Sequence, residues 1–201
     1  MLCQEVENGK VCCLSHQSIC ILQNLTMPLK VKCAKYWPEE GTSEFGNVIV
    51  THMDTSDFKY VTVRTFRVSS SKNISSPRDI FHCQYTAWPD HGLPASSTDL
   101  LALCEVVSKF SPSAPIVVHC SAGVGRTGVF CTMHSVLEYV RSRYERFGRN
   151  TPVDIAGTIL KFRTARSGMI QTKKQFIFTY NSIIDGCKHI ADQYDFEIDT
   201  N

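Results

Sequence analysis

The sequence predicts an α/β fold with a twisted mixed sheet and flanking helices. Residues 58–67 alternate polar residues with β-branched and aromatic ones, which is typical of a strand. In the second half of the chain, apolar residues recur at a spacing of three to four, which is typical of helices. Strands that precede helices in this way favour a sheet with helices packed on it. With 201 residues, 43% of them hydrophobic and 20% charged, the chain has the size and composition of one packed domain.

The expected elements follow one another along the chain. Strands are expected in short apolar runs and in segments rich in β-branched and aromatic residues. These segments are residues 11–14, 19–22, 47–52, 58–67, 80–86 and 116–118. Helices are expected at residues 97–110, in a long segment that includes Phe130 and Val140, and at residues 152–163 and 173–190. Residues 191–201 are rich in acidic side chains and are expected to form a polar tail that frays.

The composition argues against several classes of function. The formal net charge of +2 is too balanced for a nucleic-acid groove or for attachment to an anionic membrane. No apolar run approaches the ~20 residues of a membrane span, and no basic-then-apolar leader begins the chain. We therefore expect a cytoplasmic protein that binds neither nucleic acid nor membranes. The ten cysteines form no C-x-x-C pair and no zinc-like cluster, so free thiols are expected.

One segment carries the chemistry: residues 119–128, with the sequence HCSAGVGRTG, lie between a buried strand and the start of a helix. Cys120 is followed after five residues by Arg126, whose planar guanidinium matches two phosphate oxygens. Gly123 and Gly125 allow the backbone to approach a ligand closely, and the first N–H groups of a helix have no intrahelical acceptor. Together these groups bind an anion and favour the thiolate form of Cys120, which is a nucleophile for phosphorus.

This segment resembles the signature loop of the cysteine-based protein tyrosine phosphatases. Further blocks in the family's order extend the resemblance from about residue 1 to about residue 190: KCAKYWP at 32–38, WPDHG at 88–92, Arg163 with Arg166, and QTKKQ at 171–175. The resemblance implies the cysteine phosphatase fold and a tyrosine-specific, non-receptor-like catalytic domain over residues 1–190. The many cysteines and the incomplete domain also resemble those of some wasp-virus phosphatases.

The resemblance implies hydrolysis of phosphotyrosine in proteins through a phosphocysteine intermediate, with no metal ion or organic cofactor. Cys120 attacks the phosphate and Arg126 binds it. Asp90 acts first as the general acid and then as the general base, while Gln171 positions the attacking water. The residues implied in substrate binding are Ser121, Ala122, Gly123, Val124, Gly125, Arg126, Thr127, Gln175 and Lys32.

Two more residues act through their neighbours in the same resemblance. His119 tunes the reactivity of Cys120, to which it is adjacent in the sequence. Trp88 belongs with Asp90 to a loop that closes over the substrate, and Gly92 is the candidate hinge of that loop.

Departures from the family pattern leave other functions open. Tyrosine-specific members carry an N-terminal Asn-Arg-Tyr motif that this sequence lacks, and no glutamate stands near Met27 to support Arg126. The alternatives are a catalytically weak or inactive phosphotyrosine-binding fragment, and a phosphatase for phosphoserine, a lipid or an RNA 5′ end. Gln171 and Gln175 are also typical of a solvated helix start, and residues 36–38 are typical of scaffold packing.

Overall fold

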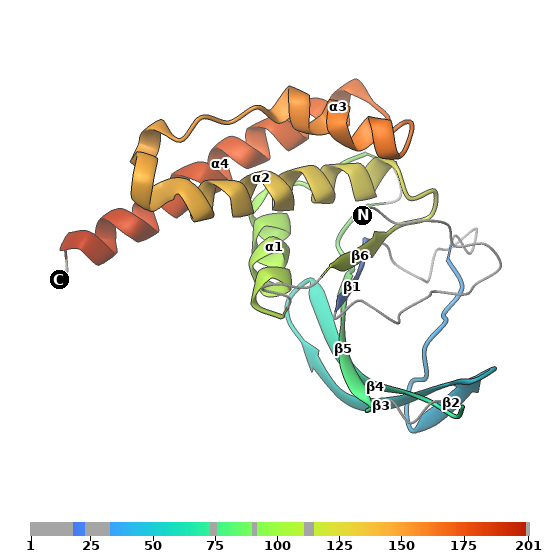
Figure 1. The fold of residues 1–201 in the computed structure, drawn as a ribbon. Helices are drawn as coiled ribbons and strands as arrows, with labels where there is room; N and C mark the ends of the chain where they lie inside the picture. The colour runs from blue at the N-terminus through green and yellow to red at the C-terminus, as the bar shows by residue number, and fades with distance from the viewer. Residues whose placement is uncertain (1–17, 23–32, 73–75, 90–91, 111–114, 200–201) are drawn as a thin grey trace. The chain divides into compact units, whose positions relative to one another are not determined.

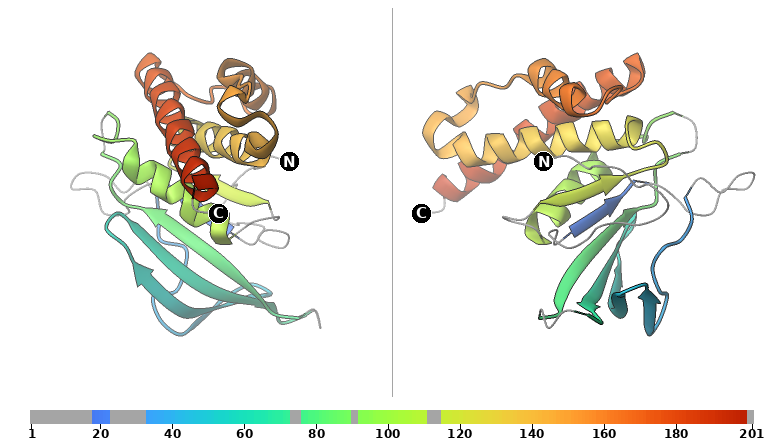
Figure 2. Two further views of the ribbon diagram at one scale, coloured as in Figure 1. Left: turned by 90° about the vertical axis from the view of Figure 1, so that its left-hand side faces the viewer. Right: turned by 45° about the vertical axis from the view of Figure 1, so that its right-hand side comes forward.

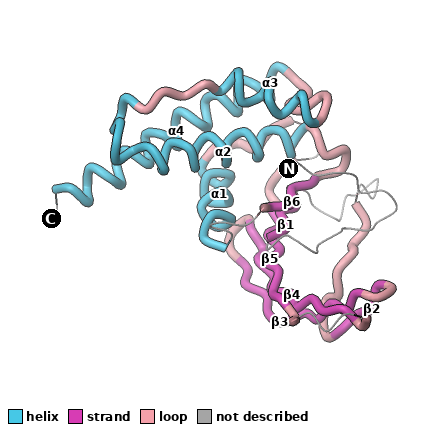
Figure 3. The backbone as a smooth tube through the Cα atoms, in the orientation of Figure 1, coloured by secondary structure: helices cyan, strands magenta, loops and turns pink. Residues whose placement is uncertain are grey.

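The computed structural model describes residues 18–22, 33–72, 76–89, 92–110 and 115–199 (Figure 1). The chain divides into two compact units. The first is formed by residues 1–90 and 105–121, and the second by residues 91–104 and 122–201. Within the described ranges, all strands belong to the first unit and most helical residues to the second (Figure 3). None of the helices in these ranges is long and apolar enough to span a lipid bilayer.

The first unit contains a twisted, six-stranded mixed sheet among its described residues (Figures 1 and 2). Its strands lie in the order β2-β3-β4-β5-β1-β6. They are β1 (Ser18–Ile21), β2 (Thr42–Phe45), β3 (Val48–Asp57), β4 (Val61–Ser70), β5 (Arg78–Tyr85) and β6 (Ile116–His119). Strands β2 to β5 pair antiparallel, whereas β1 is parallel to both β5 and β6. Strands β1 and β6 are short runs of mainly apolar residues, which is typical of parallel strands buried on both faces.

A hydrophobic cluster lies against the sheet in the first unit. Its buried members come from four strands and from the segment before β2: Ile19, Ile21, Trp37, Phe66, Val68, Ile80 and Val117. Residue pairing places β1 between β5 and β6, with Cys20 opposite both Cys83 and Val118. The cluster therefore fixes the position of β6, the strand that leads into the candidate loop.

The second unit is built on α2 (Gly125–Phe147), which contacts both α3 (Ile155–Ala165) and α4 (Lys173–Asp199). A short 3₁₀ helix, η1 (Gly148–Asn150), follows α2 directly. The helix α1 (Thr98–Phe110) begins in this unit and continues into the first from Glu105. Helix α2 buries the face that the apolar spacing predicted, including Met133 and Leu137. Close packing requires Gly186 on α4, because a Cβ there would lie 2.7 Å from Cδ2 of Leu137.

The structure confirms the predicted α/β class, with a mixed sheet and four α-helices in the described ranges. Strand β2 was not expected, because most of its residues are exposed and give no apolar pattern. Gly46, at φ +64°, and Asn47 form the two-residue turn between β2 and β3. The expectation of a polar tail over residues 191–201 is wrong for its backbone, because α4 continues to Asp199. The apolar run at residues 11–14 lies outside the described residues.

Candidate active site

Cys120 directly follows β6 in the first unit, so the sheet fixes its backbone. Ile21 of β1 pairs with His119 of β6, and the next N–H, that of Leu22, donates to the His119 carbonyl at 3.0 Å. The Cys120 side chain is half-buried. All seven cysteines among the described residues are free, which agrees with the expectation of free thiols.

A hydrogen-bonded chain leads from Tyr36 through His119 to Cys120. Burial lowers the pKa of His119, so its imidazole is neutral near pH 7. Its Nδ1 lies 3.3 Å from the Cys120 carbonyl oxygen, which can only accept, so Nδ1 carries the proton. Nε2 therefore accepts a hydrogen bond from the Tyr36 hydroxyl at 2.6 Å. The sequence predicted only a packing role for Tyr36, and its contact with His119 is a finding of the structure.

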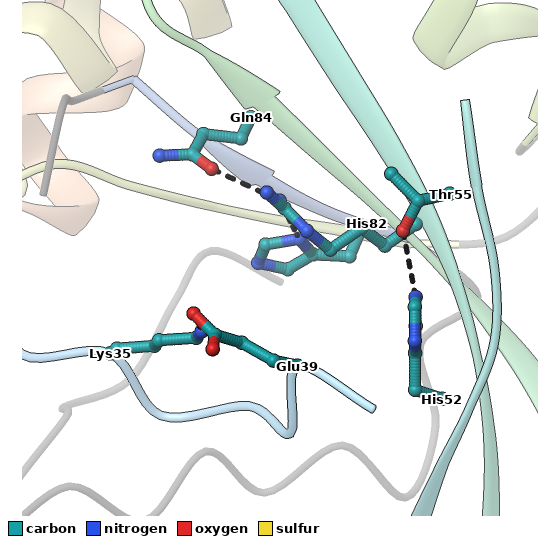
Figure 4. Close-up of polar contacts among 7 residues, drawn as sticks. Lys35, Glu39, His52, Thr55, His82 and Gln84 are labelled. Atoms are coloured by element: carbon teal, nitrogen blue, oxygen red, sulfur yellow. Dashed lines mark hydrogen bonds and ion pairs between the residues drawn. The ribbon is translucent and has the colours of Figure 1, made fainter. Parts of the chain in front are cut away.

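An aromatic cluster holds Tyr36 in place. The ring of His82, which is fully buried, lies 4.4 Å from the Trp37 ring and 6.0 Å from the Tyr36 ring, centroid to centroid. Burial, and then the charge of Arg64, lower the pKa of His82 to about 3. The Arg64 guanidinium donates to Oε1 of Gln84 at 3.0 Å and lies over the Trp37 ring. Figure 4 shows the side chain of Gln84 near His82, with this hydrogen bond as a dashed line. These side chains form a rigid layer whose histidine is neutral.

Cys33 is a second thiol in the surroundings of Cys120. Burial raises the pKa of Cys33, and coulombic repulsion between its thiolate and Cys120 is the second cause of the rise. Its sulfur donates a weak hydrogen bond to the Ala34 carbonyl at 3.5 Å. Cys33 therefore remains protonated at neutral pH. Cys120 differs from it in position, because it directly follows the last residue of β6.

Beyond Ser121 the same segment continues in the second unit and enters α2 at Gly125. Gly123 has φ +68°, a conformation that favours glycine. No side chain caps the N-terminus of α2, and its first turn contains no acidic residue. Arg126, the second residue of the helix, is half-buried. The positive end of the helix dipole therefore favours an anion at this point.

Arg166 orients the peptide groups of the loop. Its Nε donates to the Gly123 carbonyl and its Nη2 to the Ala122 carbonyl, each at 3.0 Å. In a trans peptide the C=O and the following N–H point in opposite directions. The N–H groups of Gly123 and Val124 therefore point away from Arg166, to the opposite side of the loop.

Gln171 and Gln175 lie against the first residue of α2. A Cβ built on Gly125 would stand 2.8 Å from Oε1 of Gln171 and 3.1 Å from Nε2 of Gln175. Gln175 also forms a capping box at the start of α4: its N–H donates to Oγ1 of Thr172 at 3.1 Å, and its Oε1 accepts from the Thr172 N–H at 3.3 Å. Gln175 is thus a helix-start residue, as one alternative predicted, and it also adjoins the loop.

The backbone before Gln171 is strained. Ile170 is buried and has φ +61°, which is rare and costly for a β-branched residue. Arg163 holds this turn through bonds of 2.8 Å to the carbonyls of Met169 and Ile170, and the Ile170 N–H donates to the Val124 carbonyl at 3.0 Å. These bonds fix the turn that presents Gln171. Sequence reasoning missed Ile170, because an isoleucine gives no signal for a positive φ.

Other predicted residues are placed only in part. Trp88 is buried in the first unit and packs edge-to-face on Tyr85, with 6.4 Å between ring centroids. Gly92 has φ +96°, a backbone conformation that suits glycine in a hinge. Asp90 and Lys32 lie outside the described residues.

Comparison with known families decides the membership of the chain. The sequence model of the family described as protein-tyrosine phosphatase matches residues 11–185. This chain belongs to the protein tyrosine phosphatase family.

Relatives in several organisms agree with this membership. The chain is 41% identical over 172 residues to the Lar-like tyrosine-protein phosphatase of Caenorhabditis elegans, a match that covers 84% of the chain and 7% of the relative. It is 38% identical over 176 residues to the receptor-type tyrosine-protein phosphatase F of Bos taurus, covering 86% of the chain and 9% of the relative. It is 36% identical over 154 residues to tyrosine-protein phosphatase 2 of Dictyostelium discoideum, a match that covers 77% of the chain and 41% of the relative. The chain therefore spans less than half the length of these relatives.

The predicted family and fold of the chain are confirmed. Its second unit places Gly125 of the loop against Gln171 and Gln175, whose roles stay predictions. The first unit places His119 against Cys120. Relatives of the chain include receptor-type proteins, so its non-receptor-like character and the wasp-virus likeness stay predictions.

Proposed function

We propose that this domain hydrolyses phosphotyrosine in proteins through a phosphocysteine intermediate on Cys120. The observation that supports this best is the loop that follows Cys120: Arg166 donates hydrogen bonds to two of its carbonyls, and the loop leads directly into the N-terminus of α2, whose first turn contains no acidic residue. Fixed N–H dipoles and the Arg126 guanidinium are suited to the charge of a phosphoryl group in the transition state. The proposal therefore requires no metal ion and no organic cofactor.

In the first step, the thiolate of Cys120 attacks phosphorus and forms a sulfur–phosphorus bond. The bond between phosphorus and the tyrosine oxygen breaks, and Asp90 gives its proton to that oxygen. A neutral phenol leaves more readily than a phenolate, so the acid contributes most when the leaving group is an aryl oxygen. Arg126 binds two phosphoryl oxygens throughout the step.

In the second step, water attacks the phosphocysteine. The ionised Asp90 takes a proton from the water, the sulfur–phosphorus bond breaks, and inorganic phosphate leaves with Cys120 restored as the thiolate. Gln171 orients the water, and its packing against Gly125 supports this role. The strained turn at Ile170 holds the Gln171 backbone in place.

The neutral His119 acts on the loop through the backbone. Its Nδ1–H donates to the Cys120 carbonyl, and the Tyr36 hydroxyl fixes the ring in the tautomer that makes this bond possible. His119 and Tyr36 are thus positioning residues.

The proposed substrates are phosphotyrosine-containing proteins, in agreement with the names of the relatives. We place the domain in the cytoplasm, where reducing conditions keep thiols free, as the seven described cysteines are. Lys32 is proposed to steady the loop of Trp88 and Asp90 in its closed position.

The experiment that tests the function is turnover of an aryl phosphate by the wild type and by Cys120→Ser and Asp90→Ala. Cys120→Ser is expected to have no activity but to bind phosphate, and Asp90→Ala to lose roughly 10²–10⁴ in rate. Cys187→Ser is the matched control, because it makes the same thiol-to-hydroxyl change at a half-buried position on α4. It should keep the wild-type rate.

Phosphopeptides then separate the alternatives. A phosphotyrosine phosphatase cleaves a phosphotyrosine peptide far faster than a phosphoserine peptide of the same sequence, because the loop of Asp90 serves an aryl leaving group. Equal, slow turnover by the wild type and both variants would favour a phosphotyrosine-binding fragment. Preference for phosphoserine would favour the phosphatase of another phosphoester.

A further inference from the structure

Helix α4 presents four large apolar side chains to solvent. Phe176, Ile177, Tyr180 and Ile184 have exposed fractions of 38%, 47%, 45% and 40%, and we call them the α4 stripe. Their spacing of three and four residues puts them on one side of the helix, and the rings of Phe176 and Tyr180 lie 6.3 Å apart. Contiguous exposed apolar surface of this kind marks interaction sites more often than scattered single residues do. Neither the core nor the proposed chemistry uses this stripe.

The stripe ends in a cavity within the second unit. This hollow has a volume of about 310 Å³, and Tyr180 and Ile184 of the stripe form part of its wall. Val140 and Tyr144 of α2 and the exposed Val153 supply more of the lining. A cavity of this size accepts one bulky apolar side chain.

The thiol of Cys187 is part of the apolar lining of the cavity. It lines the wall one turn beyond Ile184 and is half-buried. Burial raises its pKa, so it is a neutral thiol at pH 7. The residue therefore offers a reporter inside the cavity, because anything that fills the space shields the sulfur.

Positive charge borders the stripe at both ends. Lys173 and Lys174 stand at the N-terminal end and Lys188 at the cavity, and none of the three has an ion-pair partner among the described residues. Two carboxylates of α4 differ here: Asp192 is paired with a cation, whereas Asp185 keeps its negative charge. Asp185 accepts a hydrogen bond from Ser97, and Asp192 pairs with Arg149, which also lines the cavity.

The N-cap of α3 places one more carboxylate beside the cavity-lining Val153. The carboxylate of Asp154, next to Val153, accepts the Gly157 N–H at 2.8 Å. Among the described residues, Lys173, Lys174 and Lys188 outnumber the carboxylates of Asp154 and Asp185, so the net charge around the stripe is positive.

We propose that the α4 stripe and its cavity bind an acidic amphipathic helix of a protein partner. From Phe176 to Lys188 the surface extends for ~18 Å, which is the length of about three helical turns. Apolar side chains of the partner at i, i+3 or i+4, and i+7 lie along the stripe, and one bulky side chain enters the cavity. Its carboxylates pair with the lysines at the two ends.

The charge pattern disfavours a second copy of the chain as the occupant. Antiparallel pairing of two α4 stripes would bring Lys173 of one copy near Lys188 of the other. Parallel pairing would bring each lysine near its equivalent. Either arrangement places like charges together, whereas an acidic helix neutralises them.

The test selects helices for binding to the whole 201-residue chain. The displayed library has 14-residue sequences with apolar residues at helical spacing and either Glu or Lys at the other positions. We expect the selected pool to retain the apolar spacing and to be rich in Glu. The affinity of a selected peptide is expected to fall with added salt, and the bound peptide is expected to slow alkylation of Cys187.

A matched pair of variants locates the binding. Ile184→Lys, on the stripe, should weaken the peptide at least tenfold, whereas Leu160→Lys, at an apolar position of α3 with 61% exposure, should change the affinity less than twofold. Turnover of an aryl phosphate at the wild-type rate by both variants shows that they fold. The proposal is overturned if nothing is enriched, if Lys-rich sequences are selected, or if Ile184→Lys binds like the wild type. Sedimentation that shows a dimer dissociated by Ile184→Lys would overturn it as well.

Discussion

Replacement of Arg166 by methionine removes the brace of the loop while it keeps most of the side-chain volume. The two lost hydrogen bonds, each 3.0 Å long, join a charged guanidinium to the Ala122 and Gly123 carbonyls. A single hydrogen bond to a charged group contributes about 1.5–3 kcal/mol. Because Arg166 is half-exposed, solvent weakens both bonds, and we expect the two together to contribute about 2–3 kcal/mol. If the loop geometry matters mainly in the transition state, this loss lowers kcat/KM by roughly 30- to 150-fold.

The assay is turnover of an aryl phosphate, with KM and kcat measured separately. Arg166→Lys keeps the charge but loses the planar fork, so we expect an activity between those of the wild type and Arg166→Met. Arg149→Met is the matched control: this arginine is also in the second unit and also has a polar partner, but it lines the α4 cavity rather than the loop. Wild-type kcat/KM in a folded Arg166→Met variant would refute the role of Arg166 in orienting the loop.

Three further predictions concern other parts of the two units. Tyr36→Phe removes the hydroxyl that donates to His119, and a loss of about 1 kcal/mol should lower kcat/KM roughly fivefold with an unchanged melting temperature; a wild-type rate would contradict the positioning role. Gly186→Ala forces a Cβ to within 2.7 Å of Leu137, so urea unfolding should show a loss of about 1–3 kcal/mol, and undiminished stability would contradict the helix packing. His82 has a pKa of about 3 in the folded chain and an ordinary value near 6.5 in the unfolded chain. Between these pH values only the unfolded chain binds the proton, so the free energy of unfolding falls as the pH drops from about 6.5 toward 3. His82→Gln should therefore show a shallower decline of unfolding free energy between pH 6.5 and 4 than the wild type, and an equal slope would contradict the assigned burial.

The loop was predictable because its chemistry is local in sequence. Cys120 and Arg126 are six positions apart, and the glycines between them belong to the same pattern. The strand before it and the helix after it follow from apolar periodicity, which also placed α1 and β5. Such features need no knowledge of distant contacts.

The unpredicted features depend on contacts between residues far apart in the sequence. Tyr36 meets His119 across 83 positions, and Arg166 reaches the loop from 43 positions away. The positive φ of Ile170 exists only because Arg163 and the loop hold it, against the preference of a β-branched residue. The end of α4 was mistaken for a tail because acidic residues suggest fraying when a helix is considered alone.

The most direct test of the central claim is rapid acid quenching during turnover of an aryl phosphate, followed by mass mapping of the phosphorylated residue. Gln171→Ala should slow the hydrolysis of the intermediate more than its formation, so phosphate is expected to accumulate on Cys120. In Cys120→Ser no thiophosphate is expected. Phosphate found on another residue, or full turnover with no phosphorylated Cys120 in either the wild type or Gln171→Ala, would contradict the account.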